Sequence, residues 1–225
     1  MDAIDYSLLT ASLVTFFVVI DPIGVAPIFA SLTEGTHGAH KRRMAIKSVL
    51  ISTAVLFGFA YGGEWLLNAL HVSLDSFRAA GGVLLFMLAL DMIFEKRTER
   101  REERAEKWEE EHEDAESASG EPLKAGEDIS VFPMAIPMLA GPGAIASIML
   151  FMSEAGGNLY NQGLVFAGMG IILLVCLVLF LLVGPLMRLI GDTLAAMITR
   201  ILGVILAALA AQFIFDGIAG ALLQA

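Results

Sequence analysis

The chain has 225 residues, 57% of them apolar, and a formal net charge of −10. Soluble domains contain about 45–50% apolar residues, so this composition argues against an ordinary soluble domain. The negative charge does not indicate a basic partner, because 14 of the 24 acidic residues lie in one segment, Glu95 to Asp128. No basic surface that would suit a nucleic acid is indicated.

The apolar residues gather into six runs. A run of about 20 apolar residues crosses the hydrocarbon core as a helix, and only helices or closed barrels satisfy the backbone there. The runs lack the alternation of barrel strands. The sequence therefore predicts an all-α membrane protein with six transmembrane helices, over Tyr6–Ser31, Met44–Leu70, Phe77–Phe94, Ile129–Met152, Gln162–Met187 and Leu194–Leu223.

The positions of Lys and Arg predict the orientation, because cytoplasmic loops carry an excess of them. They follow spans one, three and five, whereas the N-terminal tail, the loop after span four and the C-terminal tail hold none. We therefore expect a multi-pass protein with both termini outside. The basic loops and the charged linker would lie in the cytoplasm.

Two motif pairs suggest an internal repeat. Three spans precede the linker and three follow it, so the second half would enter the membrane from the opposite side. Pro-x4-Pro occurs in spans one and four, and Arg-x-x-Gly in spans three and six. We predict two inverted three-helix repeats, residues 1–94 and 129–225, joined by a charged linker, residues 95–128. The alternative is chance similarity between apolar helices.

The linker itself divides into two parts. Residues 99–111 mix both charges at helical spacing, which predicts a solvated extension of span three. Residues 116–122 have the composition of a flexible linker.

Prolines predict breaks in spans one and four. A proline inside a helix removes a hydrogen bond and clashes with the carbonyl four residues back. Pro22 and Pro27 flank Gly24 in span one, and span four holds Pro133, Pro137 and Gly141-Pro142-Gly143. Free helix ends inside a membrane must be buried or line a cavity, and matched breaks in inverted halves mark the site of many transporters. The alternative is that the prolines only kink the helices.

We therefore predict a solute-binding site around the two breaks. A half-helix N-terminus attracts anions. Asp21 lies deep in span one, where a carboxylate is costly unless it is paired, hydrated or protonated. It is either a ligand for a substrate amine, a coupling ion or a proton, or a cap on the second half-helix. The predicted substrate-binding residues are Asp21, Pro22, Gly24, Val25, Pro27, Ala140, Gly141, Pro142 and Gly143.

A second group of residues is predicted to be structural or gating. Each arginine of the repeated motif precedes by three residues a glycine that allows close helix packing. The guanidinium groups either bond carbonyls of the opposite broken helix or extend to the lipid headgroups. The residues of this group are Arg78, Gly81, Arg200, Gly203 and Gln212.

No pattern of catalytic residues is present. The four histidines fall in predicted loops without metal-ligand spacing, and no nucleophile-elbow or nucleotide-binding motif is found in a suitable context. We expect no enzyme activity, no cofactor and no metal site.

The motifs resemble those of the MarC family of integral membrane proteins, also called the neutral amino acid transporter family. The resemblance covers nearly the whole chain except the linker. The sequence departs from the family pattern at Val25, where other members often carry Asn. It rests on Asp21-Pro-Ile-Gly-Val-Ala-Pro-Ile-Phe29, Arg78-Ala-Ala-Gly-Gly82, Ala135-Ile-Pro-Met-Leu-Ala-Gly-Pro-Gly-Ala144, Arg200-Ile-Leu-Gly203 and Gln212-Phe-Ile-Phe-Asp-Gly217.

The resemblance implies a six-span inner-membrane protein that transports small neutral amino acids such as glycine or alanine, coupled to a proton or sodium gradient. The leading hypothesis is therefore secondary transport of a zwitterion by alternating access. A passive channel or an exporter of another small solute is the first alternative. A membrane scaffold that uses the charged linker to bind a partner is the second. Membrane lipid is the surrounding medium, and the oligomeric state stays open.

Overall fold

The computed structural model describes residues 6–33, 36–94, 96, 99–101, 103 and 129–223, and these residues form helices and turns without any strand. The first half of the chain contains α1 (Tyr6–Ile20), α2 (Pro22–Leu32), α3 (Gly38–Ala69) and α4 (Leu74–Ile93). The second half contains the irregular segment η1 (Ser130–Leu139), then α6 (Pro142–Glu154), α7 (Leu159–Leu181) and α8 (Val183–Leu223).

Five segments are long and apolar enough to cross a membrane: Ser7–Leu32, Gly38–Ala69, Leu74–Ile93, Leu159–Leu181 and Met197–Leu222. The pair η1 and α6, bent by 56°, gives a sixth if it is counted as one span. The prediction of an all-α membrane protein is thus confirmed, with five to six candidate spans.

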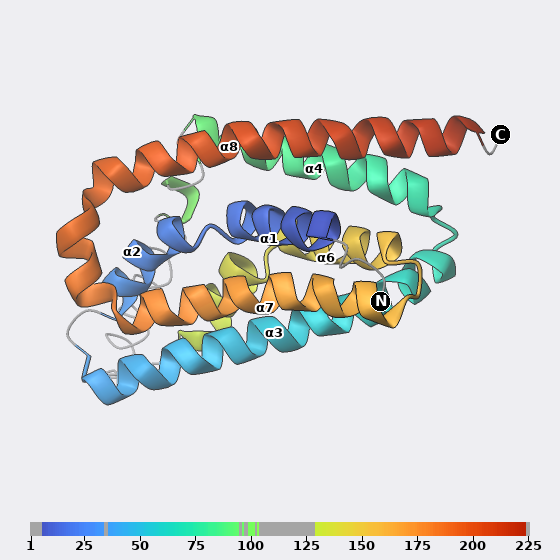
Figure 1. Ribbon diagram of the computed structural model, residues 1–225. Coiled ribbons are helices and arrows are strands. Elements are labelled where there is room, and N and C mark those ends of the chain that lie inside the picture. Colours follow the sequence, from blue (N-terminus) through green and yellow to red (C-terminus); the bar gives the residue numbers. More distant parts are fainter. Residues whose placement is uncertain are drawn as a thin grey trace, which may run out of the picture.

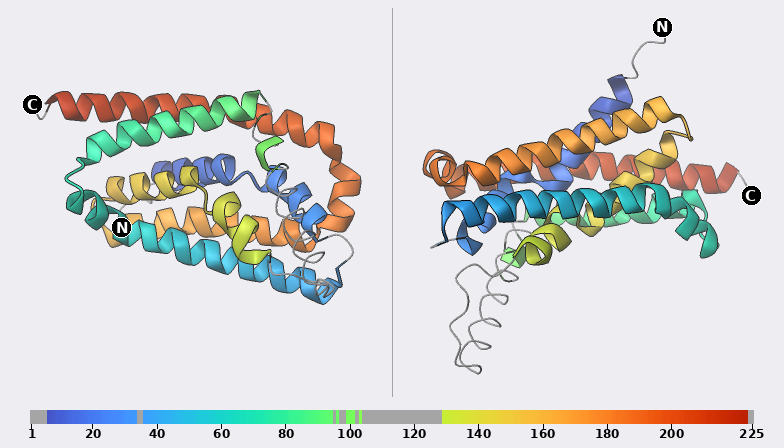
Figure 2. Two further views of the ribbon diagram at one scale, coloured as in Figure 1. Left: turned by 180° about the vertical axis from the view of Figure 1, so that it is seen from behind. Right: turned by 90° about the horizontal axis from the view of Figure 1, so that it is seen from below.

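The segments α1 and α6 lie at the centre of the molecule (Figure 1). Aromatic side chains pack α1 against α6 and α2 against α7. The α4 and α8 helices run along one side, and α3 and α7 along the other; Figure 2 shows the same order from behind. Phe29 of α2 stacks on Phe180 of α7 with ring centroids 4.5 Å apart, and Phe16 of α1 contacts Phe151 of α6 at 6.0 Å. The two segments predicted to be broken therefore form the core.

One predicted boundary is wrong. The sequence placed a loop with Arg188 between Met187 and Leu194, but α7 ends at Leu181 and α8 already begins at Val183. Pro185 falls in the first turn of α8, where its missing N–H would have had no intrahelical partner. The chain therefore turns at Leu182, inside the apolar run that was assigned to span five.

Most of the predicted linker, including residues 116–122 with the expected flexible composition, lies outside the described residues. Its described residues are helical and exposed, as predicted for a solvated helix, except at Arg101. Glu99, Arg100 and Arg101 are helical, but Arg101 is only 5% exposed. A buried arginine needs a partner, and that partner lies in the first half of the chain.

Glycines bring α4 and α8 into backbone contact. A Cβ built on Gly82 of α4 would lie 2.9 Å from the carbonyl oxygen of Ala210, and one on Gly203 of α8 would lie 3.1 Å from that of Ala89. Small residues allow such approach between membrane helices. Gly81 faces α6 instead, where a Cβ would lie 3.2 Å from Leu150.

We expect Gly82→Ala to destabilise the protein by about 1–3 kcal/mol, because the added methyl would overlap main-chain atoms of α8 that cannot move aside. Gly58→Ala is the matched control, since a Cβ there meets nothing within 4 Å. Thermal unfolding in detergent compares the two variants. Equal melting temperatures for both would contradict the close α4–α8 packing.

Candidate functional site

The first helix interruption lies at Asp21. The α1 helix ends at Ile20, and Asp21 adopts the left-handed conformation (φ 57°, ψ 68°) before α2 begins at Pro22. Asp tolerates this conformation better than most residues do, and Pro22 suits the first helical position because its φ is already fixed. The interruption therefore precedes both prolines, whereas the sequence placed it between them; Pro27 lies inside α2.

Asp21 is almost completely buried and uses both carboxylate oxygens. Its Oδ1 accepts a hydrogen bond from the Gly24 N–H at 3.1 Å, so the side chain caps α2. Its Oδ2 accepts one from Arg101 Nη1 at 3.0 Å. Arg101 Nη2 also donates to the carbonyl oxygen of Ile20 at 3.2 Å. One guanidinium thus bridges the C-terminus of α1 and the N-terminal cap of α2.

Gly24 provides the space for this ion pair. A Cβ at position 24 would overlap Asp21 Oδ2 and lie 3.1 Å from Arg101 Nη1. Removing one partner of a buried ion pair costs about 3–5 kcal/mol, because the other charge is left uncompensated. The Asp21–Arg101 contact therefore holds the segment after α4 against the α1–α2 interruption.

The second interruption lies between η1 and α6. Phe132 and Ile136 precede prolines and are extended (φ −129° and −125°), as the proline ring requires of the residue before it. The α6 helix begins at Pro142 after Gly141, and no side chain caps its N-terminus. The sequence predicted a break in this part of the chain, and η1 and α6 are bent by 56° there.

A cavity of about 430 Å³ lies beside the second interruption. This volume falls in the usual range of small-molecule sites, about 300–1,000 Å³. Arg100 and Arg101 contribute positive charge, and Asp91 of α4 pairs with Arg100. The side chains lining the cavity are those of Val19, Leu84, Met87, Leu88, Asp91, Arg100, Arg101, Pro137, Met138, Pro142 and Ala144, with Gly141 and Gly143 between them.

The structure brings only some of the predicted binding residues to this cavity. Gly141, Pro142 and Gly143 line it. Six predicted binding residues lie outside the lining: Ala140 and the residues of the first interruption, which are Asp21, Pro22, Gly24, Val25 and Pro27. Arg101 joins the two groups, because it lines the cavity and also bonds Asp21.

Two buried hydroxyls extend the polar character of the centre. Thr15 of α1 and Ser147 of α6 are fully buried, and their hydroxyl oxygens have no hydrogen-bond partner among the described residues. Thr15 lies four residues before Val19, and Ser147 lies three residues after Ala144. Such spacings place residues on one helix face, so both hydroxyls lie about one turn from the cavity lining. The sequence analysis did not identify either residue.

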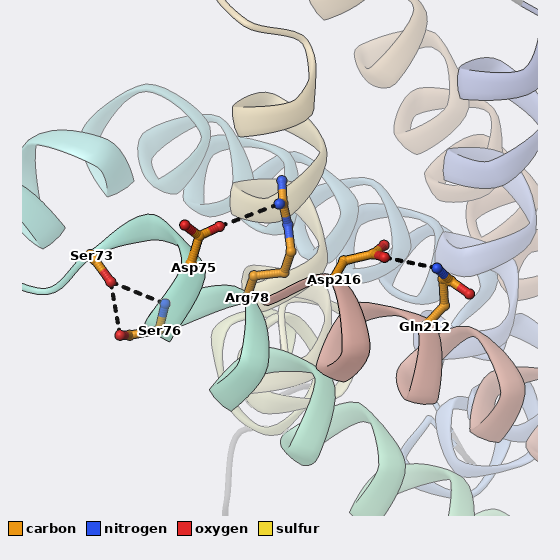
Figure 3. Close-up of polar contacts among 6 residues, drawn as sticks. All are labelled: Ser73, Asp75, Ser76, Arg78, Gln212 and Asp216. Carbon is orange, nitrogen blue, oxygen red and sulfur yellow. Dashed lines mark hydrogen bonds and ion pairs between the residues drawn. The ribbon is translucent and has the colours of Figure 1, made fainter. Parts of the chain in front are cut away.

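The residues predicted to be structural or gating lie near the N-terminal end of α4 and along α8. Arg78 Nη1 is 3.6 Å from Asp75 Oδ1, and Gln212 Nε2 donates to Asp216 Oδ1 at 2.8 Å. Figure 3 shows Arg78 between Asp75 and Asp216. Arg200 is exposed. Among the described residues, no three His, Cys, Asp or Glu side chains converge as metal ligands.

Comparison with known proteins assigns the family. A family profile described as "MarC family integral membrane protein" matches residues 6–222. A UPF0056 membrane protein of Methanocaldococcus jannaschii is 34% identical over 209 residues, which cover 93% of this chain and 95% of the relative. One from Archaeoglobus fulgidus is 33% identical over 220 residues (97% and 96%).

The UPF0056 inner membrane protein YhgN of Escherichia coli is 30% identical over 210 residues, covering 91% of this chain and 93% of the relative. No solved structure matches the chain. The family profile covers nearly the whole chain, and these relatives exceed 90% coverage in both directions. The chain therefore belongs to the MarC family of integral membrane proteins.

Proposed function

We propose that the protein is a secondary transporter of small neutral amino acids, of the glycine and alanine class, in the inner membrane. The observation that carries this proposal is the juxtaposition, in the core of an apolar helical protein, of two helix interruptions joined by one buried arginine beside a 430 Å³ cavity. Interrupted helices near mid-membrane are the usual binding elements of secondary transporters.

The cavity suits a zwitterion on chemical grounds. The uncapped N-terminus of α6 and the two arginines would attract the substrate carboxylate. Two carboxylates supply the charge opposite to the amine: Asp21, which is bonded to the lining residue Arg101, and Asp91, which lines the cavity and pairs with Arg100. The apolar side chains of Val19, Leu84 and Leu88 leave room for a small neutral side chain. Thr15 and Ser147 would continue a polar path along the α1–α6 contact.

Helix packing supports the proposal of two inverted repeats. In the first half, α1 and α2 pack on α7 and α8 of the second half. In the second half, η1 and α6 pack on α3 and α4 of the first. Two pairs of equivalent helices also contact each other, α3 with α7 and α4 with α8, and the two central segments meet through α1 and α6. Reciprocal packing of this kind is expected from a pseudo-two-fold axis that relates the halves.

The same packing refines the proposed alternating access. The halves of the chain are interleaved, so rocking one sequence half against the other would separate the central segments from their main neighbours. We propose instead that α1, α2 and α7 move against α3, η1 and α6, while α4 and α8, whose backbones are in contact, move as one unit. The orientation stays as predicted, with termini outside, and the coupling ion would be a proton or sodium.

Counterflow distinguishes a carrier from a channel. Liposomes that contain the purified protein and are preloaded with unlabelled alanine should transiently accumulate labelled alanine above its external concentration, and uptake should saturate. A channel equilibrates the label without such an overshoot. Flux that rises linearly with concentration and shows no overshoot would contradict the carrier proposal.

A further inference from the structure

One face of α3 combines basic and apolar side chains within its first turns. Spacings of three and four residues place side chains on the same helix face, and six residues with such spacings line an open groove of about 470 Å³. We call it the α3 groove. Its residues are Ala39, Arg42, Arg43, Ile46, Lys47 and Leu50.

The surroundings of the α3 groove do not neutralise its positive charge. The sequence contains no acidic residue between Glu34 and Glu64, so none lies within one helical turn of the groove on α3. Arg42 and Arg43 are exposed, and neither forms an ion pair with any residue that the structure describes. The groove therefore presents its charge to an anionic partner.

The length of α3 places the groove at the membrane surface. The helix has 32 residues and is about 48 Å long, whereas the hydrocarbon core is about 30 Å thick. All its Lys and Arg residues lie at positions 41–47, so the basic end extends beyond the core. Leu50 lies about 12 Å along the axis from Arg42. This distance reaches from the headgroup layer into the acyl chains.

A phospholipid matches this order of side chains. The α3 helix runs along the outer edge of the molecule (Figure 1), where bilayer lipid can reach the groove. Guanidinium groups bind phosphate oxygens through two parallel hydrogen bonds, and Arg42 and Arg43 lie at the headgroup end. Leu50, at the apolar end, is 62% exposed. A free phosphate ion would leave this apolar part uncovered, whereas an acyl chain would cover it.

We propose that the α3 groove binds one anionic phospholipid, with the phosphate on Arg42 and Arg43 and an acyl chain along Ile46 and Leu50. Basic pockets at the membrane surface are suited to anionic headgroups. A zwitterionic headgroup binds less tightly, because its ammonium group is repelled by the same cations. The proposal is independent of the transport function, since no groove residue lines the cavity beside the second interruption.

Native mass spectrometry of the full-length protein in mild detergent tests the proposal. Titration with dioleoyl phosphatidylglycerol should give a dissociation constant about tenfold or more below that for dioleoyl phosphatidylcholine, given the worth of each basic residue near an anionic headgroup. Arg42→Gln together with Arg43→Gln should remove most of this difference. Both side chains are exposed, so the double variant should fold normally.

Two controls separate a site from general attraction of anions. Lys41 is a neighbouring cation outside the groove lining. Lys41→Gln should weaken phosphatidylglycerol binding by less than about threefold, because its attraction to the phosphate is screened. Glycerol phosphate, which carries the phosphate without acyl chains, should not displace the bound lipid at millimolar concentration.

Equal affinities for the two lipids would overturn the proposal and leave the acidic linker, residues 95–128, as the alternative partner of this basic face. Equal losses from Lys41→Gln and Arg42→Gln would overturn it too, because the binding would then depend on net charge alone. Displacement by glycerol phosphate would assign the groove to a soluble anion instead. None of these outcomes depends on transport, and a failure of counterflow would leave the lipid site unaffected.

Discussion

Asp21→Asn should abolish solute uptake and lower thermal stability, the largest effect we expect from a single substitution. The change removes the negative charge from the first interruption and leaves the buried guanidinium of Arg101 without its counter-ion. An uncompensated buried charge costs about 3–5 kcal/mol. Uptake into liposomes and melting temperature in detergent measure the two effects separately.

Adding Arg101→Gln to Asp21→Asn separates stability from function. With both charges gone, the stability penalty should largely disappear, because each single change is penalised for the charge that it leaves behind. Uptake should stay absent, since the site still lacks its carboxylate. If Asp21→Asn alone kept the parental melting temperature and uptake, neither the buried pair nor the site assignment would stand.

Gly141→Ala should reduce uptake by about tenfold or more. A Cβ at Gly141 would lie 2.5 Å from the Pro137 carbonyl oxygen, a main-chain atom of η1. The backbone at Gly141 is extended (φ −79°, ψ 170°), a conformation that alanine also adopts. The expected effect therefore comes from the contact between the added Cβ and the Pro137 carbonyl oxygen alone. Overpacking typically costs about 1–3 kcal/mol, which corresponds to one or two decades in an equilibrium.

Gly170→Ala is the matched control for this substitution, because a Cβ on that α7 glycine meets nothing within 4 Å. It should leave uptake at the parental level. Uptake that is equal in the two variants would show that the geometry of the second interruption does not matter for transport.

Local rules account for the backbone conformation at the prolines, but the sequence did not place the first interruption correctly. Pro133 and Pro137 force the preceding residues into extended conformations, a constraint that is readable from sequence alone. The first interruption lies at Asp21 and not between the two prolines, because Pro22 starts a helix more readily than it ends one and Pro27 is tolerated inside α2. The turn at Leu182 was missed because the apolar run continues through it.

The long-range contacts could not be predicted from the sequence. A deep carboxylate at Asp21 calls for a cation, but the linker offers seven lysines and arginines, and nothing in their spacing singles out Arg101. The charged composition of residues 99–111 predicted a solvated helix, which is wrong for this one side chain. Thr15 and Ser147 were missed because isolated hydroxyls in apolar helices usually bond their own backbone.

The central claim, that this MarC family protein carries small neutral amino acids, is tested most directly by uptake of labelled glycine and alanine into liposomes with imposed proton or sodium gradients. We expect saturable accumulation driven by one of the two gradients and lost in Asp21→Asn. No accumulation of either amino acid under any gradient, from protein shown to be folded and inserted, would contradict the claim.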